Sequence, residues 1–175
     1  NARMINSIPL ALNKNIPGII EIRGEVFISI SEFENLNNKR ETNNLPKYSN
    51  PRNCASGSLR QLDPKITKSR NLDTFMYNIG YSENQIDIPK KQSERLSLIE
   101  EMGFRINKNY LITKTAKETI NFYKDCQQKI KTLNYLCDGL VIKVNELELQ
   151  NKIGSLSRTP KWAIAFKYPG NTALS

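Results

Sequence analysis

Four segments of the chain predict β-strands, and the first of them alternates cleanly between apolar and polar residues, as a half-buried strand does. In residues 19–28, IIEIRGEVFI, Ile20, Ile22, Val26 and Ile28 fall on one face, and Glu21, Arg23 and Glu25 fall on the other. Gly24, within this segment, would let a neighbouring backbone approach closely. Residues 73–81 predict a second strand, broken at Gly80. Residues 138–144 and 162–168 predict two more strands.

Capping residues and helical periodicity predict helices between these strands. Ser31 and Glu34 have the spacing of a capping box and predict a short helix through Arg40. Residues 41–70 are rich in Asn, Pro and Ser, and we expect them to be mostly irregular, with one short helix over residues 57–62 that ends at Asp63-Pro64.

Two further helices are predicted in the second half of the chain. One runs from about Gln92 to Met102 and stops at Gly103. Thr115 and Glu118 open a longer one, whose apolar stripe is expected to face the core: Ile120, Tyr123, Ile130 and Leu133. The pattern as a whole predicts a mixed α+β fold.

The composition restricts the kinds of catalytic and metal site that these residues can form. The 175 residues include 26 Lys+Arg, 17 Asp+Glu and no histidine, which gives a net charge of +9 and excludes His-based triads and imidazole metal sites from these residues. Three cysteines without a CxxC pair argue against a disulfide framework or a zinc site. We find no membrane-spanning run and no signal peptide.

The positive charge is concentrated between Lys47 and Arg70. These 24 residues hold six basic residues and one acid, Asp63, for a net charge of +5. Arg52 and Arg60 lie eight residues apart in SNPRNCASGSLRQLD, separated by small residues whose backbone N–H groups could approach an anion near a helix start. A phosphate-binding loop and a solvated basic loop are about equally supported by this pattern.

Two lysines interrupt the last two predicted strands. Lys143 shares a face with Gly139 and Val141, and Lys167 shares a face with Ala163 and Ala165, whereas the opposite face of each strand is bulky and apolar. A lysine among small neighbours could meet a phosphate as a point charge. From spacing alone, a solvated strand lysine is the commoner case.

Three other side chains are candidates on weaker grounds. Glu25 could accept hydrogen bonds from ribose hydroxyls or form a cross-strand ion pair. Asp138, before Gly139, could hold a cation or make a turn. Tyr77 could stack on a base or belong to the core.

Seven blocks resemble the adenylation (nucleotidyltransferase) domain of bacterial NAD+-dependent DNA ligases. In family order they are IPLAL, EIRGEVFI, SNPRNCASGSLRQLDP, TFMYNIGY, ERLSLIEEMGF, DGLVIKVN and RTPKWAIAFKYP, and they span nearly the whole chain. The resemblance implies an α+β nucleotidyltransferase fold of the ATP-grasp-like DNA ligase type, with mainly antiparallel sheets flanked by helices. It also implies a bacterial cytoplasmic, nucleoid-associated enzyme of DNA replication and repair.

The resemblance also implies a reaction and a set of roles. The family forms an AMP–lysine bond from NAD+, transfers AMP to the 5′-phosphate of nicked duplex DNA, and seals the nick with the 3′-hydroxyl. Glu25 resembles the carboxylate that holds the adenylate ribose, Tyr77 the aromatic that stacks on adenine, and Val141 a residue of that pocket. Lys143 and Lys167 resemble the lysines at the adenylate phosphate, Arg52 and Arg60 arginines of the DNA-dependent steps, and Asp138 a position near the catalytic Mg2+ (or Mn2+).

The family's nucleophilic lysine lies in a Lys-x-Asp-Gly motif that these residues lack, since the only Asp-Gly, at Asp138, follows Leu136 by two positions. We therefore expect a partial adenylation domain, incomplete at its N-terminus, that does not adenylate itself and lacks the downstream OB-fold and the zinc-bearing part of the enzyme. LNYLCDG replaces the usual Leu-Pro-Tyr-Glu-Ile-Asp-Gly, and Ile130 stands where the family has an arginine. An ATP-dependent ligase or capping-type enzyme and a non-catalytic nucleic-acid-binding relative are the alternatives.

Overall fold

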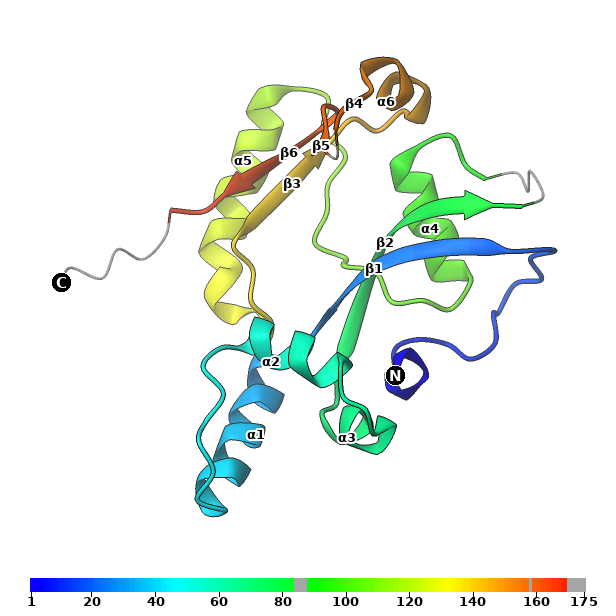
Figure 1. Ribbon diagram of the computed structural model, residues 1–175. Coiled ribbons are helices and arrows are strands. Elements are labelled where there is room, and N and C mark those ends of the chain that lie inside the picture. Colours follow the sequence, from blue (N-terminus) through cyan, green and yellow to red (C-terminus); the bar gives the residue numbers. More distant parts are fainter. Residues whose placement is uncertain (84–87, 158, 170–175) are drawn as a thin grey trace. The chain divides into compact units, whose positions relative to one another are not determined.

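The computed structural model describes residues 1–83, 88–157 and 159–169 (Figure 1). The chain forms two compact units. Unit 1 comprises residues 1–88, 95–108 and 134–136, and unit 2 comprises residues 89–94, 109–133 and those from 137 onward. Each unit is described by itself. None of the helices in the described ranges combines the length and apolar character that crossing a bilayer requires.

Unit 1 contains one antiparallel pair of strands and most of the helices of the first hundred residues. Its elements in chain order are η1 (Ala2–Met4), β1 (Ile20–Phe27), α1 (Ile30–Thr42), α2 (Pro51–Leu59), α3 (Pro64–Ser69), β2 (Asp73–Ser82) and the larger part of α4 (Gln92–Glu101). Helices α1, α2 and α3 gather at one end of the β1–β2 pair, and α4 lies along the other end (Figure 1).

Unit 2 contains two small antiparallel pairs and the remaining helices. Its elements are α5 (Ala116–Lys129), η2 (Ile130–Thr132), β3 (Gly139–Lys143), α6 (Leu147–Ile153), β4 (Ser155–Leu156), β5 (Thr159–Pro160) and β6 (Ala163–Lys167). β3 pairs with β6 and β4 with β5, and α5 runs alongside β3 and β6 (Figure 1). The mixed architecture confirms the predicted α+β class.

The β1–β2 pair confirms the alternation in residues 19–28. The charged face of β1 is exposed, and a Cβ at Gly24 would lie 2.8 Å from the Phe75 carbonyl oxygen, so glycine permits the close strand approach. β2 runs through Gly80 to Ser82, and the predicted break at Gly80 corresponds to a shift of the register, from Ser82 opposite Ile20 to Ile79 opposite Ile22. The register steps from Asn78 opposite Arg23 to Met76 opposite Gly24, so Tyr77 is the extra residue of a bulge.

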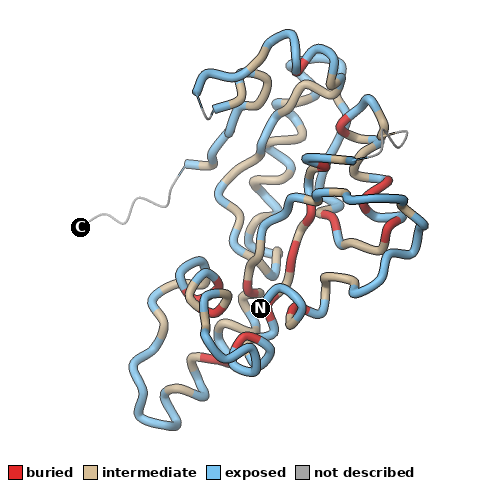
Figure 2. The backbone as a smooth tube through the Cα atoms, turned by 45° about the vertical axis from the view of Figure 1, so that its right-hand side comes forward, coloured by how far each residue is buried: buried red, intermediate tan, exposed pale blue. Residues whose placement is uncertain are grey.

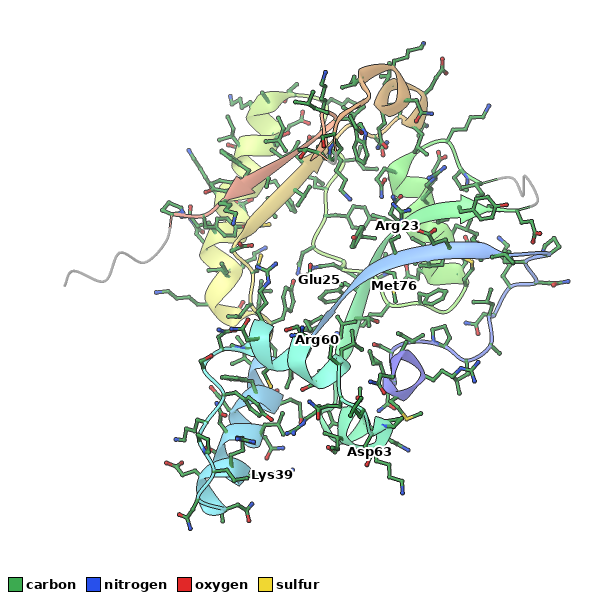
Figure 3. The ribbon with its side chains drawn as sticks, viewed as in Figure 1. Arg23, Glu25, Lys39, Arg60, Asp63 and Met76 are labelled. Atoms are coloured by element: carbon green, nitrogen blue, oxygen red, sulfur yellow. The ribbon has the colours of Figure 1, made fainter. Side chains whose placement is uncertain are left out.

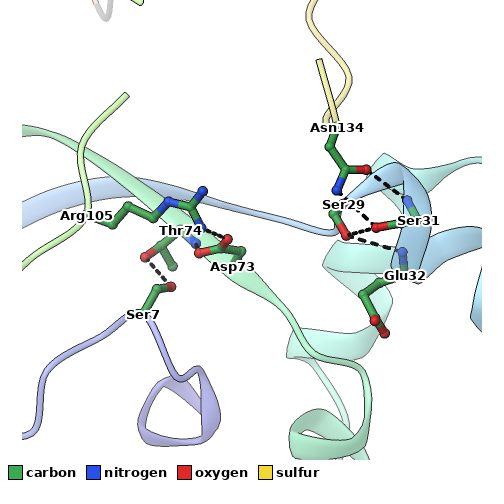
Figure 4. A network of polar contacts seen from close by, with 8 residues as sticks. All are labelled: Ser7, Ser29, Ser31, Glu32, Asp73, Thr74, Arg105 and Asn134. Carbon is green, nitrogen blue, oxygen red and sulfur yellow. Dashed lines mark hydrogen bonds and ion pairs between the residues drawn. The ribbon is translucent and has the colours of Figure 1, made fainter. Parts of the chain in front are cut away.

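The first helix begins earlier than the sequence predicted. Ser29, not Ser31, is the N-cap, and its Oγ accepts from the Glu32 backbone N–H. Asn134 satisfies the next free donors: its backbone oxygen accepts from the Ile30 N–H, and its side chain accepts from the Ser31 N–H and donates to Ser31 Oγ (Figure 4). Ser31 therefore lies in the first turn of α1 and is not its N-cap. Asn134, about a hundred residues further along the chain, supplies hydrogen-bond partners at the helix start.

The prediction that residues 41–70 are mostly irregular is also wrong. The segment contains two helices, α2 and α3, each opened by a proline at its first position and by a side-chain cap. Asn50 Oδ1 accepts from the Asn53 N–H, and Asp63 Oδ1 accepts from the Lys65 N–H. The Asn- and Pro-rich composition marks helix starts here, and Asp63-Pro64 begins α3.

Buried apolar side chains form two clusters, both in unit 1. Figure 2 colours the buried residues red along the backbone. The first joins β1, α1 and α2, and its buried members are Ile5, Ile28, Leu36, Cys54, Ala55 and Leu72. The second joins β2 and α4, and its buried members are Met76, Ile79, Leu98, Ile99, Met102 and Ile106. Ile99 and Met102 are fully buried, and the chain turns at Gly103, which has φ +96°, where the sequence predicted the helix to stop.

Helix α5 confirms the predicted start but not the predicted burial. Thr115 is the N-cap, and its Oγ1 accepts from the Glu118 N–H. No residue of α5 is buried, and Ile120 is exposed, so the stripe is not a core. Tyr123 instead contacts Phe166 and Tyr168 with ring centroids 4.3 and 5.0 Å apart. These three rings supply apolar packing between α5 and the end of β6 in unit 2.

Candidate active site

The two strand lysines lie on the same face of the β3–β6 pair. Lys143 is opposite Ala163, and Lys167 is opposite Gly139, with Val141 opposite Ala165 between them. Since residues directly across an antiparallel pair share a face, the sheet presents two lysines separated by glycine, valine and alanines. The bulky residues occupy the other face, as the sequence predicted.

Glycine is required on this face. A Cβ at Gly139 would lie 2.5 Å from the Phe166 carbonyl oxygen and 2.7 Å from Lys167 Cα. The strands thus approach closely where the Lys167 side chain leaves the sheet. Val141, in the middle of the face, is 61% exposed, so the face is open to solvent in unit 2.

The two lysines differ in their surroundings. Lys143 is partly buried, and this burial lowers the pKa of its ammonium group. The side chain of Lys167 is 71% exposed, and its Nζ lies 3.2 Å from Asp138 Oδ2. A positive charge that is partly removed from water interacts more strongly with an anion than a fully hydrated one does.

Backbone hydrogen bonds fix Asp138 and Lys167 at the end of the pair. The Tyr168 N–H donates to the Asp138 carbonyl oxygen at 2.8 Å, and the Tyr123 hydroxyl donates to the Lys167 carbonyl oxygen at 2.9 Å. Helix α5 is thereby tied to the strand that carries Lys167. Lys167 is the last residue of β6, and Asp138 directly precedes β3, so both side chains lie at one end of the pair.

Asp138 supplies a single carboxylate, which is too few ligands to hold a metal ion without other groups. The described residues contain no group of three or more Asp, Glu or Cys side chains that could enclose an ion. Mg2+ commonly takes one or two carboxylates and completes its shell with water and phosphate oxygens. One exposed carboxylate beside Lys167 fits that kind of site and does not fit an all-protein cage.

Unit 1 carries the other candidates on its exposed surface. Glu25 projects from the charged face of β1 (Figure 3). Its Oε1 lies 4.0 Å from Arg52 Nη2 of helix α2. Tyr77 is 44% exposed, which argues against the core role that the sequence left open. The bulge explains this exposure, because Met76 and Ile79 on either side of it are buried.

The structure adds Arg23 to this surface. Its guanidinium pairs with Glu21, and the Glu21 carboxylate raises the pKa of Arg23. The sequence did place Arg23 on the face of Glu25, but only the bulge in β2 brings Tyr77 beside it.

Arg52 and Arg60 stand at opposite ends of α2. Arg52 is in the first turn, and Arg60 is the C-cap, where its Nε donates to the Ser56 carbonyl oxygen at 3.3 Å. Eight residues of helix separate them by about 12 Å along the axis. The expected loop of small residues with free N–H groups is wrong, because Ala55, Ser56, Gly57 and Ser58 lie inside the helix.

The structure therefore brings together Lys143 and Lys167 on one face, Lys167 and Asp138 as an ion pair, and Glu25 and Arg52 as a longer one. The first two pairings belong to unit 2 and the third to unit 1. Within each unit the candidate residues are exposed or partly exposed, and they are carried by strands and helix ends.

Comparison with known proteins agrees with these features. Residues 1–171 match the family model of the NAD-dependent DNA ligase adenylation domain. The chain is 45% identical to a DNA ligase of Desulforamulus reducens and 41% identical to one of Dehalococcoides mccartyi, each over 100% of the chain, and 40% identical to one of Thermotoga petrophila over 99% of it. The chain spans about a quarter of the length of these relatives (26%, 26% and 25%). The chain belongs to the NAD-dependent DNA ligase adenylation domain family.

Proposed function

We propose that the full-length protein is a bacterial NAD+-dependent DNA ligase and that this chain supplies the phosphate-binding and much of the nucleotide-binding surface of its adenylation domain. The observation that carries the proposal is the pair of lysines on the open, small-residue face of β3–β6. Family membership supports the same conclusion. The finer fold assignment, an ATP-grasp-like nucleotidyltransferase, belongs to this proposal, as does action on the nucleoid in the bacterial cytoplasm.

The reaction has three displacements at phosphorus. A lysine Nζ that lies outside these 175 residues attacks the α-phosphorus of the adenylate half of NAD+, forming an N–P bond as the bond to the nicotinamide mononucleotide breaks. The 5′-phosphate of the nick then attacks the same phosphorus and releases the lysine. The 3′-hydroxyl finally attacks the activated 5′-phosphate and releases AMP.

Lys143 and Lys167 stabilise the charge that develops in these steps. Each displacement increases the negative charge on non-bridging phosphate oxygens, and fixed ammonium groups stabilise it without reorganising. The small residues between them leave room for a phosphate to approach both. Nearby cations also lower the pKa of the attacking lysine, which must lose a proton before it reacts.

The remaining residues hold the substrates. Glu25 accepts hydrogen bonds from the adenylate ribose, Tyr77 stacks on adenine, and Val141 contacts the nucleotide from the sheet. Arg52 and Arg60 bind separate DNA phosphates, because about 12 Å of helix separates them. Asp138 would supply one ligand to Mg2+, which would neutralise phosphate charge.

The test is adenylation of the full-length protein by NAD+ and Mg2+, followed by intact mass. Lys143→Ala and Lys167→Ala should each slow lysine–AMP formation by at least about a hundredfold, because each removes a fixed charge from the reacting phosphate. Lys161→Ala, in the turn before β6, is the matched control and should react normally. Normal adenylation by both strand variants would contradict the phosphate assignment.

Two comparisons separate the alternatives. If ATP supports lysine–AMP formation and NAD+ does not, the protein is an ATP-dependent relative. If neither does although nicked DNA is bound, it is a non-catalytic binding protein. Arg60→Ala should form lysine–AMP but seal nicks poorly, and a defect confined to the first step would contradict its role. The 175-residue chain alone, which lacks Lys-x-Asp-Gly, should gain no AMP adduct.

A further inference from the structure

Side chains from outside α2 hold the end of that helix, where Arg60 is the C-cap. The last carbonyl oxygens of a helix have no partner within the helix itself. In α2 three of them accept from side chains: Gly57 from Gln61 Nε2 at 3.0 Å, Ser58 from Thr67 Oγ1 at 2.9 Å, and Leu59 from Asn1 Nδ2 at 2.8 Å. The backbone next to Arg60 is therefore fixed partly by residues far from it in the sequence.

Asn1 forms a bridge across Arg60. Its Nδ2 donates to the Leu59 carbonyl oxygen at 2.8 Å and to the Gln61 carbonyl oxygen at 2.6 Å. A side-chain amide carries two N–H donors, so one group can serve both acceptors. These acceptors belong to the residues directly before and after Arg60. The backbone on each side of the arginine is thus tied to a segment about sixty residues earlier in the chain.

The segment that carries Asn1 is itself anchored. The Met4 N–H donates to the Asn1 carbonyl oxygen at 2.9 Å, across η1. Ile5, directly after η1, is 1% exposed and belongs to the buried cluster that contains Cys54 and Ala55 of α2. Because Ile5 and α2 contribute to the same core, the Asn1 amide is held at a fixed place beside the end of α2.

The side chain of Arg60 is exposed at this fixed backbone. Its Nε donates to the Ser56 carbonyl oxygen at 3.3 Å, which leaves the two Nη groups to donate to an anion. Helix ends fray, and movement of the backbone at residue 60 would move the guanidinium group with it. An arginine that is already held loses less conformational freedom when it binds a phosphate.

We propose that Asn1 is a positioning residue for Arg60. This inference rests on the proposed function, in which Arg60 binds a phosphate of the nicked DNA after lysine–AMP has formed. Asn1 supplies no group to that phosphate. It holds the backbone on both sides of the arginine, so that the guanidinium group meets the DNA in the geometry that the later displacements require.

The test is single-turnover sealing of a nicked duplex by the full-length protein that already carries lysine–AMP. Asn1→Leu keeps a side chain of similar size and removes both donors, so it should slow sealing about tenfold. The same variant should form lysine–AMP from NAD+ at the wild-type rate, because Arg60 acts only in the later steps.

Asn43→Leu is the matched control. Asn43 Nδ2 donates to the Lys39 carbonyl oxygen at 2.7 Å, at the end of α1, so the substitution removes an amide of the same kind from a different helix end. This control should seal nicks at the wild-type rate. If Asn1→Leu seals as fast as Asn43→Leu, the inference is wrong.

A double-mutant cycle separates positioning from a general structural role. If Asn1 acts through Arg60, adding Asn1→Leu to a protein with Arg60→Ala should slow sealing by less than about twofold. A further loss of about tenfold in that background would show that Asn1 acts independently of the arginine. Asn1→Ala removes the same donors without an apolar side chain and is the second variant. Loss of lysine–AMP formation by both Asn1 variants would assign Asn1 to the fold as a whole and contradict the inference.

Failure of the inference and failure of the proposed function give different results. A wild-type protein that forms no lysine–AMP, or an Arg60→Ala variant that seals normally, contradicts the proposed function. A wild-type protein that seals nicks, a slow Arg60→Ala variant and a normal Asn1→Leu variant together contradict the role of Asn1 alone.

Discussion

The two units of this chain are stabilised in different ways. All twelve buried apolar residues of the described ranges belong to unit 1, whereas the buried residues of unit 2 are Gln92 and Gln150. In unit 2, Gln150 donates to the Val144 carbonyl oxygen, and the β3–β6 ladder and the Tyr123 aromatic cluster supply the other contacts.

The buried apolar side chains are concentrated in unit 1, whereas the candidate functional residues occur in both units. Unit 1 packs a core beneath its charged strand face and its arginine-bearing helix. Unit 2 leaves its apolar side chains accessible, including Ile164 at 65% exposure, and presents its lysines on a sheet held mainly by backbone pairing. Substitutions of equal size should therefore have unequal effects in the two units.

The largest contrast is expected between two isoleucines. Ile99→Ala removes a side chain with 0% exposure and should lower the free energy of unfolding by about 3–4 kcal/mol, because it leaves a cavity between α4 and β2. Ile164→Ala truncates an exposed side chain and should cost less than about 1 kcal/mol. Urea denaturation of the chain compares them, and equal losses would show that unit 2 buries Ile164.

Three glycine-to-alanine substitutions should distinguish glycines required by a close backbone contact from a glycine that only weakens a helix. Gly24→Ala and Gly139→Ala each force a Cβ against a neighbouring strand, which should cost about 1–3 kcal/mol. Gly57→Ala is the control: nothing lies within 4 Å of its Cβ, and it is inside α2, so it should stabilise the protein by about 0.5–1 kcal/mol. Thermal denaturation compares the three variants with the wild type. A Gly139→Ala variant as stable as the wild type would contradict the predicted backbone clash.

The smallest expected effect concerns the buried charge of Lys143. Burial lowers its pKa, so the folded state binds the proton less tightly than the unfolded state, and wild-type stability should rise as the pH rises toward the ordinary lysine pKa. Lys143→Met removes the charge and should raise the melting temperature by about 2 °C at pH 7. This gain should shrink near pH 10, and a gain independent of pH would contradict the burial of the charge.

The sequence predicted the strands well, whereas the structure corrected the helices between residues 29 and 70. Alternation in residues 19–28 and 138–144 is a local property, and those strands formed as expected. Ser31 had the right spacing for a cap but lost that role to Ser29, because Asn134 donates and accepts at the helix start from far along the chain. Pro51 and Pro64 suggested an irregular segment, although proline is favoured at the first position of a helix.

The sequence likewise predicted part of the candidate site and left the rest to the tertiary structure. Alternation placed Lys143 and Lys167 each among small residues, but only the register puts them on one face of one pair. Tyr77 remained ambiguous between core and surface until the bulge in β2 turned it outward. The stacking of Arg40 and Arg70 on the Tyr48 ring had no signal in the sequence beyond a local excess of charge.

The sequence by itself determined the family, the α+β class and the residue types of the candidate chemistry, because these depend on motifs and on periodicities that span a few residues. Tertiary structure alone decided which side chains meet, from the Asp138–Lys167 ion pair to the shared tyrosine of Arg40 and Arg70. The physical reason is that strand register, a bulge and the packing of helix ends set distances between residues far apart in the chain, and no local pattern encodes those distances.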